Sequence, residues 1–266
     1  MKIDVQGRLA YAYTGGKPFD PTLPCVVFIH GALHDHSVWT LLARWAAHHG
    51  FSALAIDQPG HGRSDGPPLA DVEAIADWLL ALLDAADVQQ AALVGHSMGS
   101  LVALEAASRA PGRVTRLVMI GTAYPMKVSD ALFSAARDEP HRAIDMVTAF
   151  SYSSLASKPS YPGPGVWQHG ANRMLMRRIQ AGHAGGNLFL HDFGVCDRYA
   201  HGMEAAAQVR CPVTFVLGER DQMTSTKVTR DIAAALKAEV VALPGGHSLM
   251  QELPDGVLNA VRTALQ

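Results

Sequence analysis

Three separate segments carry side chains that could together perform nucleophilic catalysis. The first is Gly95-His96-Ser97-Met98-Gly99, which lies directly between a run of apolar residues and an Ala/Leu-rich stretch with helical spacing. On a tight turn from a strand into a helix, small residues two positions either side of a serine let neighbouring chain segments pass. Such a turn lifts the hydroxyl out of the sheet edge and points the Met98 amide toward developing negative charge. Ser97 is therefore the candidate nucleophile.

A serine hydroxyl needs a base that removes its proton as it attacks. His247 fits this role because it lies in a Gly-rich loop after the apolar run Val240 to Leu243. The imidazole in turn needs a carboxylate that fixes its tautomer and stabilises its charged form. Asp221, on the loop after the apolar run Val213 to Leu217, is the first candidate for that carboxylate, and Glu219 is the alternative.

The elements that must position these residues are indicated by hydrophobic patterning. Short apolar runs that stop at Gly, His, Asp or Pro are typical of strands buried on both faces. They are Cys25 to Ile29, Ser52 to Ile56, Ala91 to Val94, Leu117 to Ile120, Val213 to Leu217 and Val240 to Leu243. An amino-terminal hairpin is predicted at Ile3 to Val5 and Leu9 to Tyr13.

Amphipathic segments with helical spacing lie between the apolar runs. They are Val38 to His48, Val72 to Ala85, Met98 to Ala110, Thr226 to Leu236 and Asp255 to Leu265. This alternation predicts an α/β fold with a mostly parallel, eight-stranded sheet covered by helices on both faces.

One stretch breaks this rhythm. From about Tyr124 to Gln208 the sequence contains helix-like segments and no convincing buried strand. We therefore expect a helical cap or lid at residues 124–208, inserted between the two parts of the core at 1–123 and 209–266. It would cover the sheet edge that carries the reactive residues, exclude bulk water and select the substrate.

The chain resembles the α/β-hydrolase superfamily through the turn at Ser97, the order Ser97, Asp221, His247, and the surrounding strand-helix rhythm. Two further stretches, His30-Gly31-Ala32-Leu33 and Asp57 to Ser64, resemble the superfamily's oxyanion segment and its tight loop after the next strand. The resemblance implies that the backbone amides of Ala32 and Met98 hold the oxyanion, with Leu33 as a substitute donor. The Asp57 to Ser64 loop we interpret as structural, anchored by Asp57.

Together these features predict a carboxylesterase-like serine hydrolase. It would cleave an ester-like bond of a small, largely apolar substrate through an acyl-enzyme on Ser97, without a cofactor. The superfamily also contains carbon-carbon bond hydrolases, thioesterases, lyases, peroxidases and ligand receptors, and fold does not decide among them. A carbon-carbon hydrolase of a ring-cleavage product and a non-enzymatic small-molecule receptor therefore remain alternatives.

Large apolar residues beside the catalytic segments or in the insertion could line a substrate pocket. They are Leu33, Trp39, Trp167, Met223 and Leu249. A cluster of imidazoles and carboxylates at His30, His34, Asp35 and His36 suggests a metal site. Because no second, distant set of ligands accompanies this cluster, we expect no metal.

Composition excludes several other classes. With 48% hydrophobic and 17% charged residues, the 266-residue chain fits one globular unit with a large core. A net charge of −2 gives no broad field for nucleic acid or an anionic membrane. Three widely spaced cysteines suggest neither a disulfide framework nor a zinc site. With no secretory or membrane-spanning segment evident, we expect a cytoplasmic monomer or homodimer that acts on small molecules.

Overall fold

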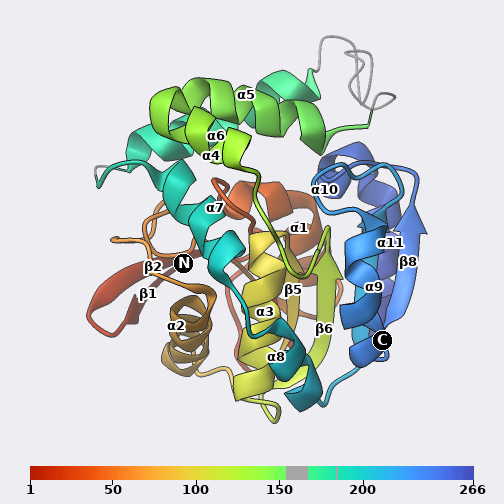
Figure 1. Cartoon of the computed structure of the whole chain (residues 1–266). Helices are drawn as coiled ribbons and strands as arrows, with labels where there is room; N and C mark the ends of the chain where they lie inside the picture. Colours follow the sequence, from red (N-terminus) through yellow and green to blue (C-terminus); the bar gives the residue numbers. More distant parts are fainter. Residues whose placement is uncertain (154–166, 184) are drawn as a thin grey trace.

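A twisted sheet of eight strands forms the centre of the protein (Figure 1). The computed structural model describes residues 1–153, 167–183 and 185–266. The strands are β1 (Lys2–Val5), β2 (Arg8–Tyr13), β3 (Cys25–Ile29), β4 (Ser52–Ile56), β5 (Ala91–His96), β6 (Val114–Ile120), β7 (Val213–Gly218) and β8 (Glu239–Leu243). Their order in the sheet is β1-β2-β4-β3-β5-β6-β7-β8. The β1·β2 and β2·β4 pairs are antiparallel and all the other pairs are parallel.

Alternate side chains of the central strands enter two separate hydrophobic cores. In β3, Val26 and Phe28 pack on one face of the sheet, whereas Val27 and Ile29 pack on the other. Every residue of β3 is buried, as expected for a strand covered on both faces. The predicted α/β class and the mostly parallel sheet are confirmed.

Helices cover both faces of this sheet (Figure 1). The helices of the core are α1 (Thr40–His48), α2 (Val72–Ala85), α3 (Met98–Arg109), α9 (Thr226–Ala235), α10 (Leu249–Glu252) and α11 (Pro254–Leu265). Helices α1 and α11 contribute to one core, and α2, α3 and α9 contribute to the other. The predicted helix from Val38 begins two residues earlier, with a 3₁₀ turn over His36–Trp39. It starts there because the Asp35 side chain caps the turn by accepting a hydrogen bond from the Ser37 amide.

The chain between β6 and β7 forms helices in its described part. They are α4 (Asp130–Asp138), α5 (Pro140–Ser151), α6 (Gln168–Gly182), α7 (Leu188–Arg198) and α8 (Gly202–Gln208). In Figure 1, α4, α5 and α6 lie above the edge at which the parallel strands end, and α7 descends from them toward the core. Helix α8 packs alongside α3, which α7 also contacts.

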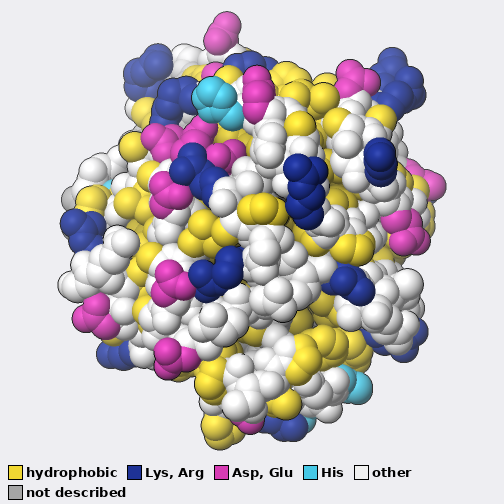
Figure 2. Space-filling view, turned by 90° about the horizontal axis from the view of Figure 1, so that it is seen from below, with side chains coloured by type: hydrophobic (Ala, Val, Ile, Leu, Met, Phe, Trp, Pro, Cys, Tyr) yellow, Lys and Arg dark blue, Asp and Glu magenta, His cyan; other side chains and the backbone are white. Residues whose placement is uncertain are grey.

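The surface opposite α4, α5 and α6 carries charges of both signs. Figure 2 shows acidic and basic side chains interspersed with apolar ones on this face. In the described part of the chain, no helix has the length and apolar character needed to cross a membrane.

Candidate active site

The turn between β5 and α3 holds Ser97 in a strained backbone conformation, with φ of 53° and ψ of −120°. The two flanking glycines are what allow this turn. A Cβ atom on Gly95 would lie 2.2 Å from the carbonyl oxygen of Gly99, and one on Gly99 would lie 2.3 Å from that of Ile29. Any larger residue at either position would collide with backbone, so the sequence pattern has a direct steric cause.

A buried imidazole–carboxylate pair forms on the loops after β7 and β8. His247 donates from Nδ1 to Oδ2 of Asp221 at 2.9 Å, and the two residues are only 6% and 7% exposed. With Nδ1 protonated, Nε2 of the neutral ring can act as a proton acceptor. This is the arrangement in which a carboxylate fixes the tautomer of a catalytic base.

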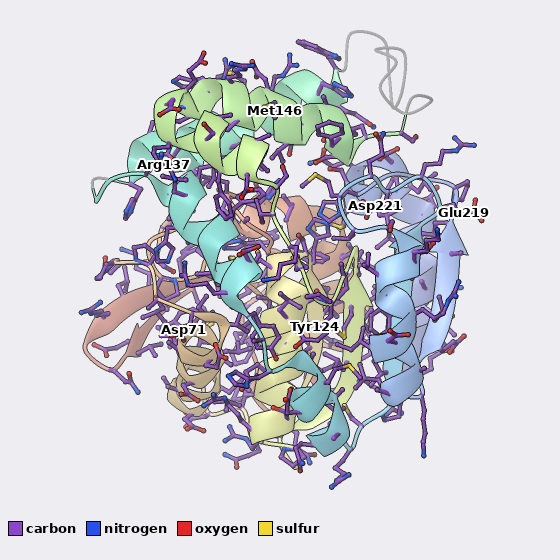
Figure 3. All side chains as sticks on the ribbon, viewed as in Figure 1. Asp71, Tyr124, Arg137, Met146, Glu219 and Asp221 are labelled. Carbon is purple, nitrogen blue, oxygen red and sulfur yellow. The ribbon has the colours of Figure 1, made fainter. Side chains whose placement is uncertain are left out.

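Further hydrogen bonds keep the Asp221 carboxylate ionised. Oδ1 accepts from the amides of Met223 and Thr224, and Oδ2 accepts from the Thr224 hydroxyl at 2.6 Å. Burial by itself raises the pKa of Asp221, but the electrostatic interaction with His247 and the hydrogen bonds from His247 and Thr224 outweigh it and lower the pKa well below its usual range. Glu219, the alternative acid, is exposed at the outer edge of the molecule, whereas Asp221 lies inward (Figure 3).

Ser97 and His247 line the same cavity, so the structure brings the turn and the imidazole–carboxylate pair together. In the described residues, the Ser97 hydroxyl and the His247 ring are not hydrogen-bonded to each other. Such bonds are commonly long before substrate binds.

Two further residues pack around His247. The centroid of the His96 ring lies 4.8 Å from that of the His247 ring, and Nε2 of His96 is hydrogen-bonded to the carbonyl oxygen of His247. A Cβ atom on Gly121 would lie 3.2 Å from the His247 ring.

The segment after β3 runs directly beside Ser97. A Cβ on Gly31 would lie 3.2 Å from the Cβ of Ser97, and the next residue, Ala32, lines the cavity. Leu33 adopts a positive φ of 53°, and its amide donates to Oδ2 of Asp192 at 2.8 Å. Because the Leu33 amide already donates to Asp192, Leu33 is unsuited to be the substitute oxyanion donor, and Ala32 is the better placed of the two.

The cavity above Ser97 has a volume of about 270 Å³ and a mainly apolar wall. Its apolar lining comes mostly from the inserted region and includes Met126, Val128, Leu132, Met146, Val147, Phe150, Phe193, Cys196 and Met223. Lys127 is the single Lys, Arg, Asp or Glu among the described lining residues, and its ammonium group donates to the Asp197 carbonyl oxygen at 2.7 Å. A mainly apolar wall with few charged groups is typical of pockets that bind neutral, largely apolar ligands.

Comparison with known proteins identifies the family of the chain. A family model described as the alpha/beta hydrolase fold matches residues 24–252. The chain belongs to this family. Similar proteins include the esterase YbfF of Escherichia coli (strain K12), 24% identical over 273 residues that cover 100% of this chain and 99% of the esterase. A putative non-heme haloperoxidase of Mycobacterium phage D29 is 26% identical over 254 residues, covering 90% and 87% of the two chains.

Among solved structures, the enol-lactonase from Burkholderia xenovorans LB400 matches with a TM-score of 0.82 and 20% identity, covering 100% of this chain and 99% of that one. At this identity the match shows the fold alone. The family model and the relatives place the chain among esterase- and hydrolase-type α/β-hydrolases, which confirms the resemblance that the sequence motifs suggested.

The predicted pocket residues of this α/β-hydrolase are mostly not in the pocket. Met223 lines the cavity, but Leu33, Trp39 and Leu249 are fully buried in the cores that flank the sheet. Trp167 is 49% exposed and packs against Arg173, and it is not among the described lining residues. The structure thus places Leu33, Trp39 and Leu249 in the core instead, because a residue near a catalytic segment in sequence can point away from that segment. The pocket role of Trp167 stays a prediction.

The histidine and aspartate side chains that suggested a metal site form hydrogen bonds within this α/β-hydrolase. Potential ligand atoms of Asp35, His36 and Asp57 all lie within 4.8 Å of one another. However, Asp57 accepts from the amide and ring of His36 and from the amide of Arg63, and Asp35 accepts from Ser37 and pairs with Arg178. These bonds occupy the carboxylate oxygens and anchor two loops, as expected for Asp57.

Sequence reasoning missed several residues that support the site. Thr224 and His96 contact the His247–Asp221 pair, and Asp192 binds the oxyanion segment from α7. His96 could have been noticed because it is the residue immediately before the candidate nucleophile. Nothing local marks Asp192, which lies 159 positions from Leu33.

Proposed function

We propose that this α/β-hydrolase is a serine hydrolase that cleaves ester-like bonds of small, largely apolar substrates. The observation that carries the proposal is the buried His247–Asp221 pair, with its 2.9 Å hydrogen bond, opening onto the same cavity as the strained turn at Ser97. A free serine hydroxyl is weakly nucleophilic, and this pair supplies the base that it needs.

In the proposed reaction, Nε2 of His247 takes the proton from the Ser97 hydroxyl as Oγ attacks the carbonyl carbon. The backbone amides of Met98, at the start of α3, and Ala32 stabilise the tetrahedral oxyanion. Collapse of this intermediate breaks the bond to the leaving group, which takes the proton from His247 and leaves an acyl group on Ser97. A water molecule that His247 deprotonates then attacks the acyl-enzyme and releases the acid.

The helices at 124–208 act in this proposal as a cap. Support comes from the cavity wall, because α4, α5 and α7 contribute Leu132, Met146 and Phe193 directly above the reactive edge. An apolar wall excludes water from the acyl-enzyme and strengthens the hydrogen bonds to the oxyanion. It also favours acyl or alcohol groups without charge.

The first test is labelling with a fluorophosphonate, followed by location of the adduct by mass. We expect the adduct on Ser97. On a panel of short-chain esters, Ser97→Ala should lower turnover at least about 10³-fold. Ser108→Ala is the matched control, because Ser108 lies on α3 away from the cavity and bonds to the Glu105 carbonyl oxygen.

An adduct at another residue, or none on folded protein, would refute the proposal. Two further arms address the alternatives. Loss of the visible absorbance of a ring-fission diketone, without ester turnover, would indicate a carbon-carbon hydrolase. A single slow turnover accompanied by a ligand-induced rise in melting temperature would indicate a receptor.

A further inference from the structure

A buried histidine–carboxylate pair joins α7 to the core beside the oxyanion segment. Asp192 of α7 accepts from Nε2 of His61 at 2.8 Å, and their side chains are only 2% and 3% exposed. The same carboxylate oxygen accepts the amide of Leu33 at 2.8 Å. A single buried oxygen thus holds a loop after β3 and a loop after β4 against α7.

The surroundings of His61 favour the protonated form of its ring. Its Nε2 faces the carboxylate of Asp192 and its Nδ1 faces the carbonyl oxygen of Pro59 at 3.1 Å, and both of these partners are acceptors. Both contacts are hydrogen bonds when each ring nitrogen carries a proton. Burial lowers the pKa of His61, but the charge of Asp192 and its hydrogen bond outweigh this and raise the pKa above its ordinary value.

The neighbouring histidine provides a contrast. The ring of His30 lies 5.1 Å from that of His61, but Nε2 of His30 accepts a hydrogen bond from the Gln58 amide at 3.1 Å. A nitrogen that accepts carries no proton, so His30 is neutral. Of the two rings, His61 is therefore the one whose surroundings favour a positive charge, directly against Asp192.

Leu33 needs a strong partner because of its backbone. Its φ of 53° is unfavourable for a residue with a branched side chain and persists only where surrounding contacts enforce it. Two further contacts bind the same segment to α6. His34 is hydrogen-bonded through Nε2 to Oδ1 of Asn172 at 3.0 Å, and Arg178 donates to Asp35 at 2.6 Å. Three consecutive residues, 33 to 35, are thus bound to the inserted helices.

We propose that Asp192, with His61 as its counter-ion, is a positioning residue that fixes the Ala32 amide in the oxyanion-binding orientation. The inference rests on the proposed serine-hydrolase function. The Asp192 carboxylate holds the amide of the peptide between Ala32 and Leu33, whose carbonyl oxygen is hydrogen-bonded to Nδ1 of His34 at 2.8 Å. Gly31, on the other side of Ala32, lies against Ser97. With both ends of this short segment fixed, the Ala32 amide has little freedom to turn away from the cavity.

The test measures kcat and KM on a short-chain ester for Asp192→Ala, Asp192→Asn and His61→Gln. Asp192→Ala removes the acceptor for the Leu33 amide, and we expect kcat to fall about 10- to 100-fold with KM changed less than about threefold. This is below the 10²–10³ typical of deleting an oxyanion donor outright. Asp192→Asn keeps one acceptor oxygen, and His61→Gln keeps a donor to Asp192, so each should retain several-fold more activity than Asp192→Ala.

A matched control separates positioning from general loss of stability. Tyr199, immediately after α7, donates a buried hydrogen bond to Glu105 on α3 at 2.7 Å, away from the oxyanion segment. Tyr199→Phe removes this hydrogen bond between the same region and the core, and should lower the melting temperature without lowering kcat. An independent readout is amide hydrogen exchange at Leu33, which should accelerate in Asp192→Ala and much less in Asp192→Asn.

Wild-type kcat in folded Asp192→Ala, or a loss no larger than that of Tyr199→Phe, would overturn the inference while leaving the proposed function intact. The inference would also be overturned if kcat fell as far in Asp192→Asn as in Asp192→Ala while the rate of amide hydrogen exchange at Leu33 stayed unchanged. If the wild-type protein neither hydrolyses esters nor forms the Ser97 adduct, the proposed function fails first and the role given to Ala32 fails with it.

Discussion

The hydroxyl of Thr224 donates to Oδ2 of Asp221 at 2.6 Å, and this is the oxygen that also holds Nδ1 of His247. The Thr224 oxygen itself lies 3.1 Å from that ring nitrogen. Thr224 is 3% exposed, so bulk water cannot readily replace its hydroxyl. One threonine therefore orients the carboxylate that in turn orients the imidazole.

Replacing Thr224 by Val should lower kcat about tenfold, because the buried carboxylate loses a charge-assisted hydrogen bond and becomes freer to rotate. Thr224→Ser keeps the hydroxyl and is the matched control, which should stay within about threefold of wild type. The measurement is kcat on a short-chain ester at fixed pH, with melting temperatures taken in parallel. Equal activity of the Val and Ser variants would show that the hydroxyl has no such role.

The Asp221 carboxylate also predicts how stability depends on pH. Its pKa in the folded protein lies below the unfolded value of about 3.9, so acidification protonates the unfolded state first. The stabilisation that the ionised carboxylate contributes is therefore complete above about pH 4 and is lost as the pH falls toward the folded pKa. The difference in unfolding free energy between wild type and Asp221→Asn should be largest near pH 6 and should shrink at pH 3.

Urea unfolding at both pH values measures this difference. Glu219→Gln, an exposed carboxylate two positions earlier in the same loop, is the control and should show little dependence on pH. A difference between wild type and Asp221→Asn that stayed constant from pH 6 to pH 3 would contradict the assignment of a lowered pKa to Asp221.

The steric origin of the turn at Ser97 gives a further prediction. Gly95→Ala would place a methyl group 2.2 Å from the Gly99 carbonyl oxygen, where backbone on both sides must shift. We expect a loss of unfolding free energy of about 3 kcal/mol together with loss of the fluorophosphonate adduct. Gly112→Ala has no atom within 4 Å of its Cβ, and should stay within about 0.5 kcal/mol of wild type. Full labelling of Gly95→Ala would show that the turn tolerates a side chain.

Local patterning predicted the features that depend on neighbouring residues. The apolar runs located the sheet because buried strands are continuous in sequence, and the Gly95 and Gly99 spacing located the turn because its sterics are local. Contacts between residues far apart in the sequence were harder to predict. Leu33 was read as a pocket residue, yet its positive φ and buried side chain place it in the core, held by a residue 159 positions away. No local signal encodes that contact.

The shape of the cavity predicts how substrate length can be altered. Met146 of α5 lies in the inserted region above the core (Figure 3) and lines the mainly apolar cavity of about 270 Å³. Met146→Trp adds bulk to this wall, so kcat/KM for an octanoate ester should fall at least about tenfold, whereas acetate ester turnover should stay within about threefold. Met174→Trp is the matched control, because Met174 on α6 is 65% exposed and is not among the described lining residues. Equal loss on both esters would mean that the added ring disturbs the reactive groups themselves, and no loss on either would mean that the acyl chain does not enter this cavity.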